Sequence, residues 1–144
     1  MNDLADGWFW RMHRGELPPP PVSMLLKQRI VRVDLERGEL DAEFVADASF
    51  ANPAGHVQGG MLAAMLDALT ASVVDATLQA GERVASLSLN VSFLKAAQIG
   101  PIQGRAHLVR KGRTVAHAGA ELVQGDVAVA SATAVCMVVP QAGH

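Results

Sequence analysis

A carboxylate, Asp67, stands in the middle of a long apolar segment of this 144-residue chain. From Met61 to Ala80 the residues are apolar on nearly every side, and Gly81 follows at a position typical of a helix end. Burial disfavours the charged form of a carboxylate, so such an acid is either satisfied by hydrogen bonds or kept for chemistry. We interpret Asp67 as a general base or nucleophile in a dry site. Asp75, near the predicted helix end, is interpreted as a solvated or capping residue.

Hydrogen-bond donors stand immediately before this predicted helix. Gly59 and Gly60 open it, and the N–H groups of a first helical turn have no partner within the helix. With the positive end of the helix dipole, these groups form a site suited to an oxyanion. Asn52 and Gln58 add side-chain amides just upstream. A donor-rich helix start and a carboxylate together have the chemistry needed to polarise and attack a carbonyl group.

The spacing of these groups predicts a dimer. Gly60 and Asp67 are seven residues apart on one helix, or roughly 10 Å at about 1.5 Å per residue. A reacting carbonyl needs both groups within about 3 Å. One chain therefore cannot supply both to the same carbon, and we expect Asp67 to act on a substrate polarised by Gly60 of a second chain across a two-fold axis.

Strand-like segments flank the helix. Two runs between residues 25 and 47 are joined near Gly38, which can supply the positive φ of a hairpin. Residues 85–93 alternate strictly, which predicts one apolar face (Leu87, Leu89, Val91 and Phe93) and one polar face (Ser86, Ser88, Asn90 and Ser92). Three more runs, linked at Gly112 and Gly125, predict an antiparallel meander.

The order of elements is therefore two strands, one long helix and four strands. It predicts an α+β fold in which an antiparallel sheet of five or six strands wraps around the helix. Residues 1–24 are predicted to form a short helix and a Pro-rich arm, and residues 25–140 the main domain. The four consecutive prolines of the arm favour an extended conformation.

Composition narrows the classes of function. Half of the residues are hydrophobic and the formal net charge is −2, which is typical of a soluble globular protein. The single cysteine, Cys136, fits a reducing compartment and is predicted to be a small core residue. The N-terminus lacks the apolar core of a signal peptide, and Asp67 and Asp75 argue against a membrane span. We expect a cytoplasmic protein that binds neither nucleic acid nor membrane.

The motif N-x2-G-x2-Q-G-G-x6-D, from Asn52 to Asp67, is followed by "SLSLNVSFLKAA" and "VRKGRTVAHAGAELV". Together they resemble the hotdog-fold acyl-CoA thioesterases of the PaaI-type (phenylacetic acid degradation) branch, within the 4-hydroxybenzoyl-CoA thioesterase superfamily. The resemblance covers roughly residues 25–138. It implies hydrolysis of an acyl-CoA thioester, no cofactor or metal, and a homotetramer built as a dimer of dimers.

The same resemblance assigns roles to individual residues. It implies that Asp67 activates water or attacks the carbonyl, that a Gly59 amide (with Gly60 adjacent) polarises the thioester oxygen, and that Asn52 places the carbonyl or water. The family usually has His where this chain has Gln58. Gln58 can donate a hydrogen bond but cannot titrate near neutral pH. His56 could replace the missing His only if the loop is rearranged.

Further residues are candidates for substrate binding. Ser86 matches a hydroxyl position of this branch and could orient Asp67 or the water; otherwise it lines a polar strand face. The basic run containing Arg110, Lys111 and Arg113 could hold the phosphates of CoA, or could be a solvated turn. Two alternatives to a thioesterase stay open. One is a non-catalytic acyl-CoA-binding protein, and the other, disfavoured by the lack of His in the helix, is a dehydratase or hydratase. The acyl group itself is left open.

Overall fold

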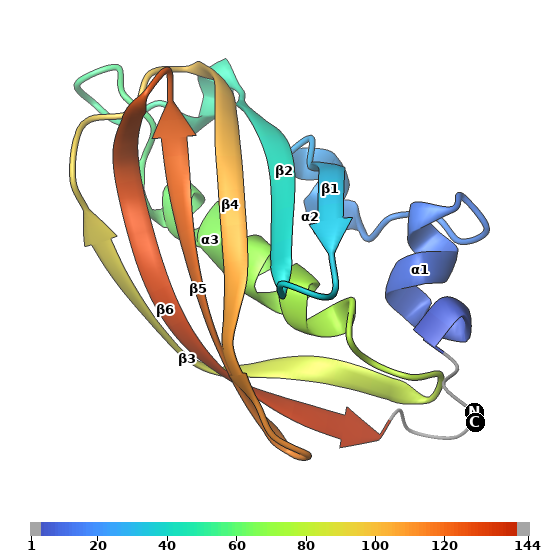
Figure 1. Cartoon of the computed structure of the whole chain (residues 1–144). Coiled ribbons are helices and arrows are strands. Elements are labelled where there is room, and N and C mark those ends of the chain that lie inside the picture. The colour runs from blue at the N-terminus through green and yellow to red at the C-terminus, as the bar shows by residue number, and fades with distance from the viewer. Residues whose placement is uncertain (1–3, 141–144) are drawn as a thin grey trace.

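A six-stranded antiparallel sheet wraps around one long helix in the computed structural model, which describes residues 4–140 (Figure 1). The sheet has the order β1-β2-β4-β5-β6-β3. Its strands are β1 (Arg29–Asp34), β2 (Glu39–Ala46), β3 (Glu82–Phe93), β4 (Gly100–Lys111), β5 (Val115–Gln124) and β6 (Val127–Pro140). The central helix is α3 (Gly59–Asp75). The α+β prediction, the six strands and the meander from β4 to β6 are confirmed.

Only one side of α3 faces the sheet. That side is fully buried and carries Leu62, Met65, Leu66, Leu69, Thr70, Val73 and Val74. The opposite side carries small residues such as Ala64 and Ala68 together with Asp67, and it is only partly covered. No helix among residues 4–140 is long and apolar enough to span a membrane. The helix α3 is therefore apolar nearly all round, but its own sheet buries only one side. The remaining apolar residues lie on the side that carries Asp67.

The helix is shorter than predicted. It ends at Asp75 rather than at Ala80, because the following N–H groups of Thr77 and Leu78 bond to the carbonyls of Val74 and Asp75, three residues back, in tight turns. Gly81, with a φ of 84°, belongs to the turn that leads into β3 and does not cap the helix. The sequence suggested a longer helix because residues 76–80 contain no glycine or proline, so that Gly81 is the first stop signal after Asp75.

A β-bulge changes the faces of β3. Ser86 is opposite Cys136 of β6 and Ser88 is opposite Val135, so Leu87 is the extra residue. Residues opposite one another in an antiparallel pair share a face, and Cys136 is buried on the helix side of β6. The bulge thus places Ser86 on the same face as Leu89 and Val91. The strict alternation predicted for residues 86–93 is wrong at Ser86, because periodicity cannot anticipate an inserted residue.

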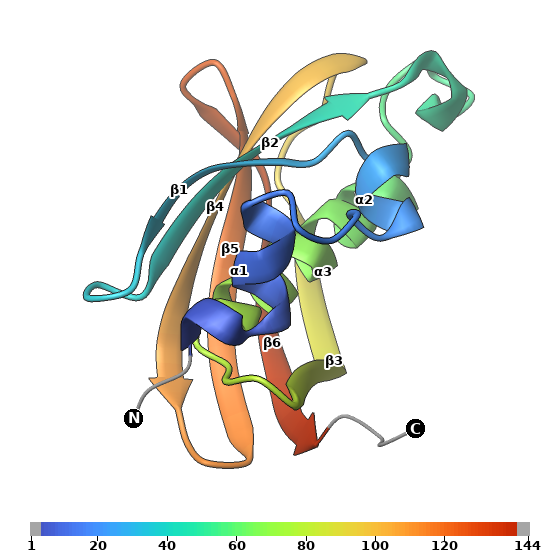
Figure 2. The ribbon, with the colours of Figure 1, turned by 90° about the vertical axis from the view of Figure 1, so that its right-hand side faces the viewer.

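The N-terminal arm packs on α3 away from the sheet. It comprises η1 (Leu4–Asp6), α1 (Trp8–His13) and α2 (Pro21–Leu25), and Figure 2 shows both α-helices beside α3. The indole N–H of Trp10 donates to the carbonyl of Ala76 at 3.0 Å, and Phe9 is buried. Pro21 begins α2 instead of extending the proline run, since its fixed φ suits a first helical turn. Residues 1–3 of the arm lie outside the described range, and a boundary at residue 24 stays a prediction. A second short 3-10 helix, η2 (Ala48–Phe50), follows β2.

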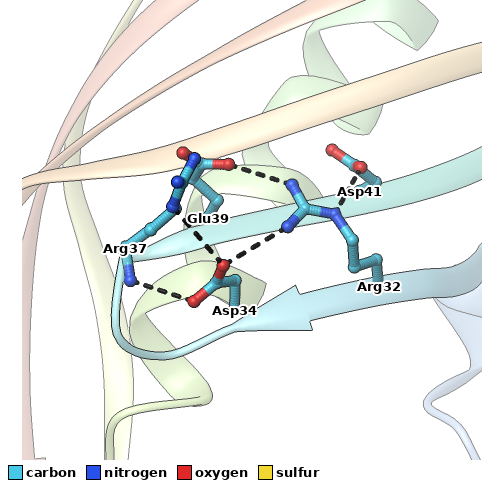
Figure 3. Close-up of polar contacts among 5 residues, drawn as sticks. All are labelled: Arg32, Asp34, Arg37, Glu39 and Asp41. Atoms are coloured by element: carbon cyan, nitrogen blue, oxygen red, sulfur yellow. Dashed lines mark hydrogen bonds and ion pairs between the residues drawn. The ribbon is translucent and has the colours of Figure 1, made fainter.

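The two edges of the sheet differ in character. At one edge, β1 carries Arg32, whose guanidinium bonds to Glu39 at 2.9 Å and to Asp41 at 3.0 Å within the charged β1–β2 hairpin (Figure 3). Such charges discourage pairing with another strand. At the other edge, β3 is twelve residues long and exposes Leu87 and Phe93. The β3 edge is therefore the longer and less charged of the two.

Candidate active site

The start of α3 opens onto a cavity of about 330 Å³. Asn52, His56 and Gly59 line it, so the structure brings together three of the residues predicted from sequence. Gln58 and Gly60 are adjacent in the chain but are not among its lining residues. Within residues 4–140, the N–H groups of Gly59 and Gly60 donate to no acceptor, as expected for the first turn of a helix. They are available to a bound oxygen atom.

Two residues at this cavity were not assigned to the site from sequence. Phe93 lies so close to Gly59 that a Cβ built there would be 3.1 Å from the ring, so a side chain at this position would require the ring to move. Lys95 also lines the cavity and adds a positive charge beside the free amides. Phe93 is the last residue of β3, and Lys95 comes two residues later. Only tertiary packing places this end of β3 over the start of α3.

The side chain of Asn52 has a local structural task. Its amide oxygen accepts hydrogen bonds from the backbone N–H groups of Ala54 at 3.0 Å and His56 at 3.1 Å. This turn orders the loop before α3 and fixes His56 at the cavity. In the described part of the chain the Nδ2 group of Asn52 has no hydrogen-bond acceptor, so it remains available to a ligand. His56 reaches the cavity without any rearrangement of the loop.

Asp67 is held by Ser86. The Ser86 hydroxyl donates to Oδ1 of Asp67 at 2.8 Å, and this contact exists because the bulge in β3 turns Ser86 toward the helix. The orienting role of Ser86 stays a prediction, for which this hydrogen bond supplies the geometry. Asp67 is partly buried in the single chain and lies at the flank of α3 beside the edge strand β3. One carboxylate oxygen is therefore fixed, while the residue faces a surface that a second protomer can cover.

Cys136 packs behind this pair. It is fully buried opposite Ser86, and burial raises the pKa of its thiol, with the negative charge of Asp67 adding to the effect. A thiol kept protonated is a poor nucleophile. The prediction that Cys136 is a small core residue is confirmed.

The donor set and the carboxylate are separated within one protomer. Gly59 and Asp67 are eight residues apart on α3, or about 12 Å along the helix axis. The cavity at Gly59 does not include Asp67 among its lining residues. Arg110, Lys111 and Arg113 are exposed in the β4–β5 hairpin, which lies near the first residues of β3 and so at the far end of the molecule from Gly59. One chain thus carries three separate parts of the predicted site.

Asp75 is not a freely solvated residue, contrary to the expectation from sequence. Burial raises its pKa to about 7, against the effect of a hydrogen bond from the N–H of Val84. It lines a second cavity, between α3 and the arm, together with His13 of α1 and Arg29 of β1. The sequence could not indicate this, because the arm that covers Asp75 is more than 45 residues away along the chain.

The raised pKa of Asp75 predicts a pH-dependent stability. The folded protein holds this proton more tightly than the unfolded chain, where the pKa is near 3.8. Stability is therefore lost as pH rises from about 4 through 7. Asp75→Asn has no charge to bury, so its stability relative to wild type should increase by about 2 kcal/mol between pH 5 and pH 8. Urea denaturation at both pH values measures this difference.

The matched control for that experiment is Asp126→Asn, which changes an exposed aspartate in the β5–β6 turn. It should leave the pH dependence of the wild-type protein unchanged. Identical pH dependence of wild type and Asp75→Asn would contradict the burial of this carboxyl.

No group of three or more His, Cys, Asp or Glu side chains in residues 4–140 is placed to hold a metal ion. The described site offers a carboxylate, a hydroxyl and backbone amides. These groups suit proton transfer and the stabilisation of an oxyanion.

Comparison with known proteins identifies the class to which this fold and site belong. The wrapping of the sheet around α3 is the hotdog fold, seen also in thioesterases of known structure. Residues 46–137 match the family model described as "Acyl-CoA thioesterase N-terminal domain", which is more than half of the chain. The protein therefore belongs to this acyl-CoA thioesterase family, and this membership supports a thioester hydrolase as the class of enzyme.

Individual relatives agree with this assignment. The chain is 52% identical to a "putative thioesterase, phenylacetic acid degradation-related protein" of Ralstonia eutropha, with 90% of this chain and 98% of that chain covered and a TM-score of 0.89. The PaaI protein of Escherichia coli, at 17% identity, shares the fold with a TM-score of 0.80 over 92% of this chain and 94% of that one. The predicted resemblance to PaaI-type thioesterases is confirmed.

A "putative esterase" of Caenorhabditis elegans is 31% identical over 90 residues, which are 62% of this chain and 53% of that protein. The match thus spans about half the length of this curated relative.

Proposed function

We propose that this protein hydrolyses acyl-CoA thioesters to a free acid and CoA, in cytoplasmic active sites that are each shared by two protomers. One observation carries the proposal. Asp67 is oriented by Ser86 at the flank of α3 beside β3, while the free amides that would polarise its substrate lie eight residues away. Two chains related by a two-fold axis, with antiparallel α3 helices, would bring these groups together. The homodimer is thus part of the proposal, and a homotetramer would pair two such dimers.

The lone edge strand suggests how the two chains would meet. In each protomer Asp67 lies beside Ser86, and Gly59 lies beside Phe93. If the two β3 strands pair antiparallel so that Asp67 meets the partner's Gly59, Ser86 is opposite the partner's Phe93. Because Leu87 is an extra residue in each strand, Leu89 is then opposite the partner's Val91 and the two-fold axis passes through Asn90.

The same register would complete the CoA site. The β4–β5 hairpin lies near Ala85, because Val115 and Ala85 are both opposite Met137 of β6. Pairing across the two-fold axis would carry Arg110, Lys111 and Arg113 toward the partner's Lys95, at the mouth of the cavity beside the partner's Gly59. Exposed cations at this position suit the phosphate groups of CoA.

Hydrolysis in this arrangement needs no cofactor. The thioester oxygen would accept hydrogen bonds from the partner's Gly59 and Gly60 amides, with Asn52 and Gln58 helping to place the carbonyl or the water. Asp67 would take a proton from a water molecule as its oxygen attacks the carbonyl carbon. Collapse of the tetrahedral intermediate breaks the C–S bond, and the CoA thiolate leaves with the electron pair.

Alternatively, Asp67 would attack the carbonyl itself, and water would hydrolyse the resulting anhydride. A single turnover in heavy-oxygen water separates the two routes. Direct attack by water labels only the released acid, whereas an anhydride that water opens at the Asp67 carbonyl leaves the label in the protein.

Release of free thiol from acyl-CoA thioesters of different lengths tests the proposed activity. Gln58 in place of the usual His favours one competing function, a non-catalytic acyl-CoA-binding protein. Saturable binding of acyl-CoA without any thiol release would support that alternative and would contradict hydrolysis.

Subunit complementation tests the shared site. Asn52→Asp keeps the acceptor oxygen that orders its own loop but removes the Nδ2 donor, and Asp67→Asn removes the base. Each variant alone should be nearly inactive. Co-expressed chains should recover about a quarter of wild-type activity, because about half of the dimers are mixed and each mixed dimer has one intact site. No recovery in dimers shown to be mixed would place both residues in sites of a single chain.

A further inference from the structure

The N-terminal arm and α3 enclose a cavity of about 430 Å³ to which the proposed reaction assigns no role. This volume lies in the range of small-molecule sites. Its walls are largely apolar and come from α1, the proline run, α2 and β1; they include Trp8, Met12, Pro20, Val22 and Ile30. Hydrogen bonds fix the arm on both sides of the cavity. Trp10 bonds to the end of α3, and Gln28 donates to the Ser72 hydroxyl at 3.2 Å.

The floor of this cavity starts beside the proposed catalytic carboxylate. Ala68, Ala71, Ser72 and Asp75 line it at the spacing of one helical face. Ala68 follows Asp67 directly, and Ala71 lies one turn beyond it on the same side of α3. The small side chains of both alanines leave room between the helix and the arm. Asp67 itself does not line the cavity, but a substrate carbonyl at Asp67 would lie within about one helical turn of Ala68 and Ala71, which do.

We infer that this cavity receives the acyl tail of the substrate, and that the arm thereby makes the protein selective for acyl-CoA thioesters with medium-length, unbranched tails. This inference rests on the proposed function. The length follows from the floor of the cavity. Asp67 and Asp75 are eight residues apart, about 12 Å along the helix, and the carboxyl of Asp75 ends the apolar part of the floor.

The polar end of the cavity sets the upper limit of tail length. Asp75 lies there, and His13 of α1 is near it because α1 is tied to Ala76 by Trp10. Arg29 of β1 also lines the cavity, and its guanidinium is paired with Glu43 at 2.7 Å. A tail long enough to cover these groups would strip them of water without offering hydrogen bonds, which is unfavourable. A very short tail would leave the apolar walls unfilled.

Two substitutions on α2 test this inference as a matched pair. Val22 lines the cavity and is 51% exposed, whereas Met24 is 64% exposed and does not line it. Wild type should hydrolyse octanoyl-CoA with a higher kcat/KM than acetyl-CoA. Val22→Trp, which fills the cavity, should lower kcat/KM for octanoyl-CoA by about tenfold or more and leave acetyl-CoA unchanged. Met24→Trp should change neither value.

A second variant changes the cavity in the opposite sense. Trp8 lines the cavity, and Trp8→Ala should enlarge it and shift the preference from octanoyl-CoA toward decanoyl-CoA. If wild type prefers acetyl-CoA, or if both cavity variants keep the wild-type ratio of octanoyl-CoA to acetyl-CoA, the inference is wrong although the proposed hydrolysis stands.

Failure of the proposed function gives a different result. If no thioester is hydrolysed, calorimetric binding of octanoyl-CoA still tests the cavity. Weaker binding by Val22→Trp than by Met24→Trp would support an acyl site under the arm. Equal affinities, or no binding by wild type, would overturn it.

Discussion

Replacing Asp67 by asparagine is expected to lower kcat for acyl-CoA hydrolysis by about a thousandfold, or about 4 kcal/mol in the activation free energy. The change removes the only group at the flank of α3 beside β3 that is both oriented by a hydroxyl and able to accept a proton in the proposed reaction. The fold should tolerate it. The Ser86 hydroxyl, now 2.8 Å from Oδ1 of Asp67, can donate to the amide oxygen of asparagine equally well.

The kinetic pattern distinguishes catalysis from binding. Loss of the base should act on kcat, while KM for the thioester stays within a few-fold of wild type. Thiol release under saturating substrate measures the first quantity, and urea denaturation verifies that stability is retained. Asp126→Asn, at an exposed turn, is the matched control and should be fully active. Wild-type turnover by Asp67→Asn would remove Asp67 from the mechanism altogether.

The second large effect is expected at the edge of the sheet. Leu87 is the bulged residue of β3 and is 55% exposed in the single chain. If β3 pairs with its copy in a second protomer, Leu87→Asp places an unpaired charge in that interface, at a cost of about 3–5 kcal/mol. The protein should become monomeric. Because each proposed site draws on two chains, thiol release should fall to background at the same time.

Val31→Asp provides the matched control for this experiment. Val31 lies on β1 at the opposite edge of the sheet, beside a comparable bulge, and is 49% exposed. It should leave both the oligomeric state and the activity unchanged. Analytical ultracentrifugation and thiol release, measured at the same protein concentration, give both results. A Leu87→Asp monomer that still turned over substrate would refute the shared site.

The fold was predictable because its signals are local. The alternation within β3 shows the two-residue period of a strand, and the glycine of the β1–β2 hairpin supplies a positive φ. The apolar run of α3 is too long for a typical strand, which favours a helix. Asp67 was noticeable within the same run, because a carboxylate in apolar surroundings must be satisfied by hydrogen bonds or serve in chemistry. The gap between Asp67 and Gly59 is likewise local geometry, since both residues belong to one helix.

Other features depended on contacts between distant segments, which no local period encodes. The extra residue at Leu87 aims Ser86 at Asp67, and it becomes visible only when β3 is aligned against β6. The burial of Asp75, the cavity beneath Trp8 and the placement of Phe93 over Gly59 likewise require the chain to be folded. By itself the sequence determined the order of the elements and the residues with chemical potential. The tertiary structure alone decided which side chains face one another, because desolvation and cavity shape arise only where remote parts of the chain pack together.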